Sequence, residues 1–326
     1  MSETGATGPW AKLGGRIKAA SEHPVGAASL VWLKRALFVG ILYILWRQIS
    51  SIGWSEVLSS LPTSPLFYLI WATRYALTPA LETQTYRIIW QRPMAGHFWV
   101  FMRKRVYNQG VAGYSGEGFL TLWANRNLGW TTKQVLISIK DANLLSGLSA
   151  NFVTLILVLI AFGAGLAGPL MAGVPRGELL LLIGTLTPLA LLIGVLVLRT
   201  KLIHLSWPDM RAVLAWHGLR HLGLIVLAVA MYASAIPGVP LIVWLSFVVL
   251  FMVLTRIPFL PNQDLVYLAA ALAVTSSVGV PADVMAGVLV CEAALMQIAN
   301  FGLFVGTSHL GKAKADEGQS ASSDTA

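Results

Sequence analysis

Long uninterrupted apolar runs dominate this 326-residue chain and restrict what it can fold into. Examples are the stretches 155–170, 179–198, 222–235 and 241–254. Charged residues make up only 11% of the chain, against about 25% in soluble domains. Inside a bilayer each backbone N–H and C=O must be bonded within the protein, so continuous apolar runs predict membrane helices. The sequence therefore predicts an all-α, polytopic membrane helix bundle.

The apolar runs predict about eight membrane segments, near 34–54, 63–82, 143–169, 178–198, 212–235, 239–255, 264–279 and 281–306. The segment 264–279 would be about 24 Å long as a helix. That is less than the hydrocarbon core of about 30 Å. We leave open whether this segment crosses the membrane or re-enters it.

Three parts of the chain differ in composition. Residues 1–27 form a polar segment, residues 28–310 a single transmembrane helical domain, and residues 311–326 a polar tail that is expected to be disordered. Basic residues concentrate in alternate loops, a bias that places both termini in the cytoplasm of a multi-pass bacterial inner-membrane protein. The single cysteine, Cys291, excludes a disulfide within the chain.

Two non-helical breaks interrupt the apolar pattern at corresponding points of the two halves. They are 108–118 (NQGVAGYSGEG) and 256–264 (RIPFLPNQD). Paired interruptions of this kind mark the substrate site in many transporters, although ordinary interfacial loops have the same composition. The residues expected to form the breaks are Gly113, Gly116, Gly118, Pro258 and Pro261.

One polar stripe lies within the second expected span. Arg74, Thr78 and Glu82 are spaced i, i+4, i+8 and so share a helix face, and Pro79 is expected to kink the helix. Charged residues at membrane depth are costly unless they are paired or hydrated. The stripe therefore predicts either a polar wall for a lipid headgroup or an internal ion pair.

Further polar residues lie at the breaks and in the last span. We expect them to line the same headgroup path, although the acids could instead cap helices or form internal hydrogen bonds. They are Glu117, Asp264, Glu292, Gln297 and Asn300. The stretch 96–107 combines aromatic residues with Arg103, Lys104 and Arg105 and predicts an interfacial helix that attracts anionic lipids, or a plain span end.

Enzyme and metal motifs provide little support for other functions. The sequence contains no GxxxxGK[ST], HExxH or GxSxG motif, and its histidines are scattered. His217 and His221 are four residues apart, with Arg220 between them and no acid nearby, so we expect them to be solvated at the interface. The pattern predicts no metal site and no cofactor.

Three stretches resemble a known family, namely 75–90 (YALTPALETQTYRIIW), 113–130 (GYSGEGFLTLWANRNLGW) and 256–301. The chain resembles the flippase-like integral membrane proteins related to the lipid-flipping transmembrane region of lysylphosphatidylglycerol synthase. The late break of that family is usually glycine-rich and contains an acid. Here it has no glycine, and only Asp264 could replace the acid.

The resemblance implies transport or flipping of a lipid, either a phospholipid or an isoprenoid or hopanoid-type lipid. The headgroup would pass through a polar intramembrane cavity. Two other functions stay open: an intramembrane enzyme that modifies a lipid or polyprenyl phosphate, and a non-catalytic membrane assembly factor. The expected partners are membrane lipids and a lipid-biosynthesis protein, and no nucleic acid.

Overall fold

The computed structural model describes residues 43, 46, 47, 50, 53–110, 114–166, 168, 177–257 and 263–308. Helices and the turns between them make up these residues, with no β-strand among them, which confirms the predicted all-α class. The polar segments expected at 1–27 and 311–326 lie outside the described residues, as does most of the first expected span. Gly113, Pro258 and Pro261 also lie outside them.

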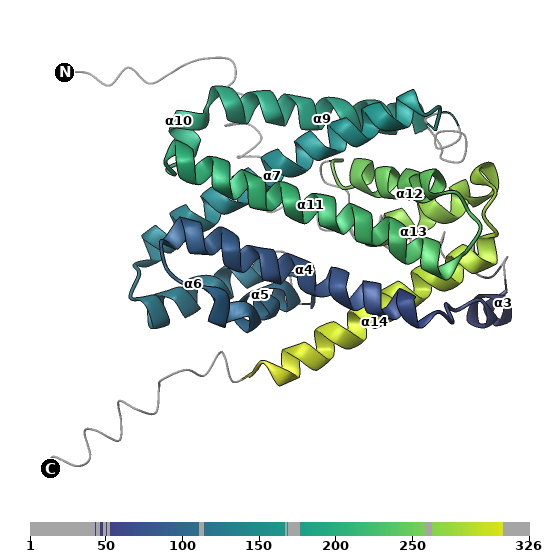
Figure 1. Ribbon diagram of the computed structural model, residues 1–326, viewed down its shortest axis with the longest axis horizontal. Coiled ribbons are helices and arrows are strands. Elements are labelled where there is room, and N and C mark those ends of the chain that lie inside the picture. Colours follow the sequence, from purple (N-terminus) through teal and green to yellow (C-terminus); the bar gives the residue numbers. More distant parts are fainter. Residues whose placement is uncertain are drawn as a thin grey trace, which may run out of the picture.

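Four of the described helices are long and apolar enough to cross a membrane (Figure 1). They are α7 (Thr132–Gly163), α9 (Gly177–Val197), α11 (Trp207–Ala235) and α14 (Ala282–Gly306). The short helix α10 (Arg199–Leu202) joins α9 to α11. The expected count of about eight spans is not confirmed, because shorter helices and one long charged helix take several of the expected places.

Helix α4 (Pro65–Trp90) follows the short α3 (Trp54–Ser59) and runs through the bundle beside α11 (Figure 1). At about 1.5 Å per residue, its 26 residues extend about 39 Å, enough to cross a bilayer. Pro79 lies inside this helix, as expected. Because of its polar side chains, α4 is not one of the four helices that are apolar enough to cross. Burial against neighbouring helices, rather than apolarity, holds α4 in place.

The first break, predicted as non-helical over 108–118, is helical at 108–110 and 115–118, where two short helices end and begin. After the 3-10 turn η1 (Ala95–His97), α5 (Phe98–Gly110) and α6 (Ser115–Leu128) pack against each other. Each is only about 20 Å long and too short to cross. The hairpin enters at the end of the bundle where α4 ends and α7 begins (Figure 1). Helix α5 buries Val100, Phe101, Met102 and Val106 inside the bundle, which an interfacial helix would not do, whereas Trp99 stays exposed.

The described residues on either side of the second break belong to another pair of short helices. Helices α12 (Leu241–Leu254) and α13 (Gln263–Val274) contact each other, and the 3-10 turn η2 (Thr275–Val278) leads on to α14. They have 14 and 12 residues, about 21 and 18 Å. The sixth expected span, 239–255, is thus too short to cross, and α13 confirms the short seventh segment. This hairpin enters from the opposite end (Figure 1).

The chain therefore repeats one arrangement twice, with opposite orientation. In the first half a short hairpin connects α4 and α7, and in the second half a short hairpin connects α11 and α14 (Figure 1). Helices α4 and α11 run antiparallel along each other. Inverted repeats with interrupted helices are a common architecture of secondary transporters.

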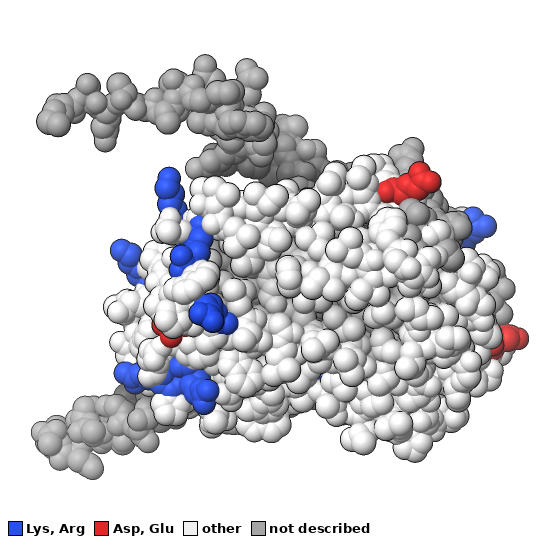
Figure 2. Space-filling view, turned by 45° about the horizontal axis from the view of Figure 1, so that its top comes forward, with Lys and Arg blue, Asp and Glu red and all other residues white. Residues whose placement is uncertain are grey.

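The surface separates charged ends from an apolar middle (Figure 2). Lysine and arginine side chains gather at the end where α4 and α6 finish and α7 and α11 begin, and the band between the two ends is almost free of charge. Large exposed apolar side chains, such as Leu182, Leu222 and Phe301, lie on the helices of this band. The described surface is suited to contact with lipid.

Candidate functional site

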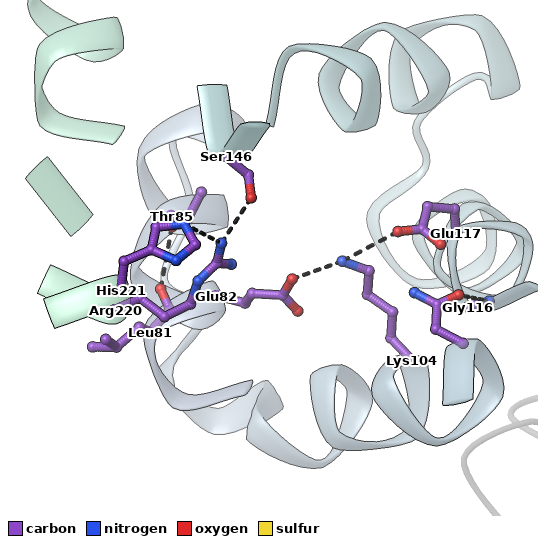
Figure 3. Close-up of polar contacts among 10 residues, drawn as sticks. Leu81, Glu82, Thr85, Lys104, Gly116, Glu117, Ser146, Arg220 and His221 are labelled. Carbon is purple, nitrogen blue, oxygen red and sulfur yellow. Dashed lines mark hydrogen bonds and ion pairs between the residues drawn. The ribbon is translucent and has the colours of Figure 1, made fainter. Parts of the chain in front are cut away.

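Lys104 of α5 lies between two carboxylates in the interior of the bundle (Figure 3). Its Nζ is 2.8 Å from Oε1 of Glu82 on α4 and 3.6 Å from Oε1 of Glu117 on α6. No more than 15% of any of these three side chains is exposed. The three residues form an ion triad that connects both helices of the first hairpin to α4.

The turn of the first hairpin is shaped by a close backbone approach. The backbone N–H of Gly116 donates to Oδ1 of Asn108 at 2.7 Å (Figure 3). A Cβ at Gly116 would collide with the carbonyl oxygen of Lys104. Glycine is therefore needed at this position for the two arms to meet. Gly118 is exposed, and a Cβ there meets no atom within 4 Å.

Arg220, near the middle of α11, faces the same region as Glu82 and interacts with it electrostatically (Figure 3). Its Nη2 donates to Oγ of Ser146 on α7 at 2.7 Å and lies 3.4 Å from Nε2 of His221. Arg220 and His221 are each 8% exposed, and His217 is 3% exposed. Among the described residues, no carboxylate forms an ion pair with Arg220.

Arg256 extends from the turn of the second hairpin toward α7. Its Nη1 donates to Oδ1 of Asn151 at 3.2 Å, and its Nη2 donates to Oγ1 of Thr255 at 3.3 Å. Its Nε is buried and has no hydrogen-bond partner. Arg256 also interacts electrostatically with His221, which places the end of α12 near the middle of α11.

A second ion pair joins the long helices on the other side of the interior. Arg74 of α4 pairs with Oε1 of Glu292 on α14. This contact is the internal ion pair that the sequence analysis gave as one of two alternatives for the polar stripe of α4. The hydroxyl of Tyr232 donates to Oε2 of Glu292 at 3.4 Å, and the hydroxyls of Tyr232 and Tyr267 are 3.2 Å apart. Nε of Arg74 is buried without a partner.

Arg105 connects the two groups of charges. Its guanidinium lies 4.4 Å from the ring centroid of Tyr75, whose hydroxyl donates to Oδ1 of Asn300 at 2.7 Å. It interacts electrostatically with Arg74 and Glu82. No carboxylate pairs with it among the described residues. We call the following residues the interior polar cluster: Arg74, Glu82, Lys104, Arg105, Glu117, Arg220, Arg256 and Glu292.

Asp264 lies at the edge of this cluster, in the first turn of α13. It interacts electrostatically with Glu292, Arg74 and Arg105, and its own side chain is exposed. An exposed carboxylate that interacts with these charges places the cluster close to the molecular surface on this side. The start of the second hairpin and α5 of the first hairpin therefore approach each other here.

The structure brings most of the expected site residues together. Arg74, Glu82, Glu117 and Glu292 belong to the cluster, while Asp264 and Asn300 border it. Four other residues that were expected to contribute to the site lie outside the cluster. Thr78 is half-buried and forms no side-chain hydrogen bond with the described residues, while Gly118 and Gln297 are exposed. Arg103 donates to Phe304 O and Thr307 Oγ1 at the end of α14.

The basic triplet of α5 is the clearest correction. Arg103 and Lys104 are 5% and 4% exposed, and Arg105 is half-buried, so they do not form a surface that attracts anionic lipids. Lys104 instead balances the charge of two acids. The sequence pattern was misleading because basic residues next to aromatic ones usually lie in exposed cytoplasmic loops. Here they belong to a helix that packs inside the bundle.

The sequence analysis missed the interior role of Arg220, Arg256 and the two histidines. It placed the start of the span at 212, which put His217 and His221 near the interface. Helix α11 begins at Trp207, after Ser206 accepts a hydrogen bond from the backbone N–H of Asp209. The sequence Ser-Trp-Pro-Asp is a recognisable helix start and would have placed these residues half-way along the helix.

Several buried polar atoms of the cluster lack partners within the described protein. They are Nε of Arg74, Arg105 and Arg256, and Oε2 of Glu117; Nε2 of His217, beside the cluster, is unpartnered as well. Buried polar groups are normally hydrogen-bonded, so these atoms indicate places for water or a ligand. The arrangement supplies both donors and acceptors inside the helix bundle. No group of three or more metal-ligating side chains occurs in the described part of the chain.

Comparisons of the chain with models of known families, with characterised proteins and with solved structures give no match. The function is therefore argued from this site and from the arrangement of the helices around it.

Proposed function

We propose that this protein moves a lipid between the two leaflets of the bacterial inner membrane. The headgroup would pass along the interior polar cluster while the hydrocarbon chains stay in the bilayer. The observation that carries this proposal is the convergence of charged residues from both re-entrant hairpins, α4, α11 and α14 on one interior region. Intramembrane charges of this kind usually mark a substrate pathway.

The architecture supports the same function. Two short hairpins reach the interior from opposite ends, so each side of the membrane is faced by the mouth of one hairpin. Transporters place their substrate site where interrupted helices of inverted repeats meet. The resemblance to flippase-like proteins, carried by residues 75–90, 113–130 and 256–301, agrees with this assignment and extends it to lipids as the substrate.

The charged end of the molecule would face the cytoplasm. Exposed basic side chains at this end include Arg87, Arg92, Lys133 and Arg211, whereas Glu178 is exposed at the opposite end. Cytoplasmic loops of inner-membrane proteins carry an excess of lysine and arginine. The first hairpin would then open toward the cytoplasm and the second toward the periplasm.

Reconstitution into vesicles provides the direct test. Fluorescent phospholipid in the outer leaflet is quenched by dithionite, and transfer between leaflets raises the accessible fraction above one half. We expect wild-type protein to do this, and Arg74→Ala and Glu117→Ala to lose most of the activity. Glu178→Ala is the matched control, because its side chain lies outside the cluster. Unchanged lipid movement in both cluster variants would exclude these residues from the pathway.

A further inference from the structure

The interior polar cluster carries more positive than negative charge. Its cations are Arg74, Lys104, Arg105, Arg220 and Arg256, and its carboxylates are Glu82, Glu117 and Glu292, which leaves two cations in excess (5 − 3). Burying unbalanced charge is costly. An anion in this interior would remove that cost.

The excess belongs to arginines that form no ion pair with a described carboxylate. Lys104 and Arg74 have direct carboxylate partners, whereas Arg105, Arg220 and Arg256 have only neutral hydrogen-bond or ring partners. Arg220 uses only its Nη2 in contacts with the described residues, and Nε of Arg256 is buried and unpaired. Nε2 of His217, one turn before His221, is also buried and unpaired. Buried nitrogen atoms without partners therefore lie in this region, and Glu82, the acid that interacts electrostatically with Arg220, already pairs with Lys104.

Both guanidinium groups lie beside His221. Nη2 of Arg220 is 3.4 Å from Nε2 of His221, and Arg256 interacts with the same histidine electrostatically. Both arginines also donate to α7, Arg220 to Ser146 and Arg256 to Asn151. The planar, fixed charge of arginine is well matched to phosphate.

We propose that Arg220 and Arg256, with His221 between them, form a binding site for a phosphate group at membrane depth. This inference rests on the proposed function and narrows the substrate to a lipid whose headgroup carries an anionic phosphate. Because free phosphate has the same chemistry, it is the other source of the ligand that an experiment must distinguish.

Binding measurements on purified wild-type protein test the site without any variant. Native mass spectrometry in a neutral detergent compares phosphatidic acid, phosphatidylglycerol and diacylglycerol, which shares their chains but lacks phosphate. We expect both phosphate lipids to bind at least about tenfold more tightly than diacylglycerol, as expected for charge-assisted hydrogen bonds. Millimolar inorganic phosphate should compete only weakly. Strong competition would assign the site to free phosphate, and equal binding of all three lipids would overturn the proposal.

Variants then locate the site. Arg220→Gln with Arg256→Gln should weaken phosphatidic acid binding at least about tenfold. Arg211→Gln, on the exposed surface of the same helix α11, should leave binding unchanged. Circular dichroism and gel filtration confirm folding, and if the double variant does not fold, each single variant is measured instead. Unchanged binding in folded variants would refute the assignment.

The phosphate site and the proposed lipid movement can fail independently in these experiments. Movement of phosphatidylcholine or a neutral lipid by wild-type protein, without preferential binding of phosphatidic acid, would retain lipid translocation and remove the phosphate site. Tight phosphatidic acid binding that depends on both arginines, without lipid movement in vesicles, would retain the site and remove translocation.

Discussion

Replacement of Lys104 by methionine tests the ion triad directly. The substitution removes the ammonium group and keeps much of the side-chain volume, so Glu82 and Glu117 stay buried without their cation. At an effective dielectric constant of about 20, attraction between unit charges is about 6 kcal/mol at 2.8 Å and about 5 kcal/mol at 3.6 Å, the two separations in the triad.

Most of this attraction is offset by the cost of removing the charges from water. Loss of one partner from a buried ion pair typically destabilises a protein by about 3–5 kcal/mol, and we expect a loss of this size for Lys104→Met. Replacement of all three charged residues by neutral ones avoids the unbalanced carboxylates. The triple variant Glu82→Gln, Lys104→Met, Glu117→Gln should therefore recover most of the lost stability while lipid movement stays low.

The assay is reversible unfolding by sodium dodecyl sulfate in mixed micelles, followed by tryptophan fluorescence. Lys133→Met provides the matched control, because Lys133 is exposed at the start of α7 and its loss should change stability by less than about 0.5 kcal/mol. The reasoning is refuted if Lys104→Met unfolds like the wild type. It is also refuted if the triple variant is as unstable as the single variant.

Three further predictions concern other parts of the fold. Gly116→Ala should destabilise the protein by about 1–3 kcal/mol in the same unfolding assay, because its Cβ meets the Lys104 carbonyl, whereas Gly118→Ala should be neutral or slightly stabilising. Thr131→Ala removes the capping box of α7 and should lower the free energy of unfolding by about 1 kcal/mol in the same assay. An unchanged unfolding midpoint would show that this helix start does not limit stability. In a Cys291→Ser background, cysteines at Lys133 and Glu178 should react with impermeant maleimide from the cytoplasmic and periplasmic sides respectively; labelling of both from one side would contradict the proposed orientation.

The general architecture was predictable because hydrophobicity is a local property of the sequence. Continuous apolar runs correctly indicate membrane helices such as α7 and α14, and the glycine- and proline-rich breaks coincide with the two hairpin turns. The number of membrane crossings could not be predicted as well from the sequence. The sequence indicated that the segment of α13 is short, whereas the segment 239–255 looked long enough to cross, and only the structure shows that α12 has 14 residues.

The candidate site was predictable in its acids more than in its cations. Glu82, Glu117 and Glu292 stand out in apolar or glycine-rich surroundings. Lys104 and Arg220 did not, because basic residues are also the usual marks of cytoplasmic span ends. Their role depends on which helix enters the bundle, and this follows from tertiary packing rather than from local composition.

The pairing of Arg74 with Glu292 has a consequence for the biosynthesis of this protein. The two residues are 218 positions apart in the sequence. At about 5–20 residues per second, the ribosome makes Glu292 roughly 10–40 s after Arg74. Helix α4 thus exits the ribosome well before its countercharge exists and is too polar to partition alone into hydrocarbon. A nascent chain that stops before α14 should leave α4 dependent on the translocon, or exposed to quality-control proteolysis, until synthesis is finished.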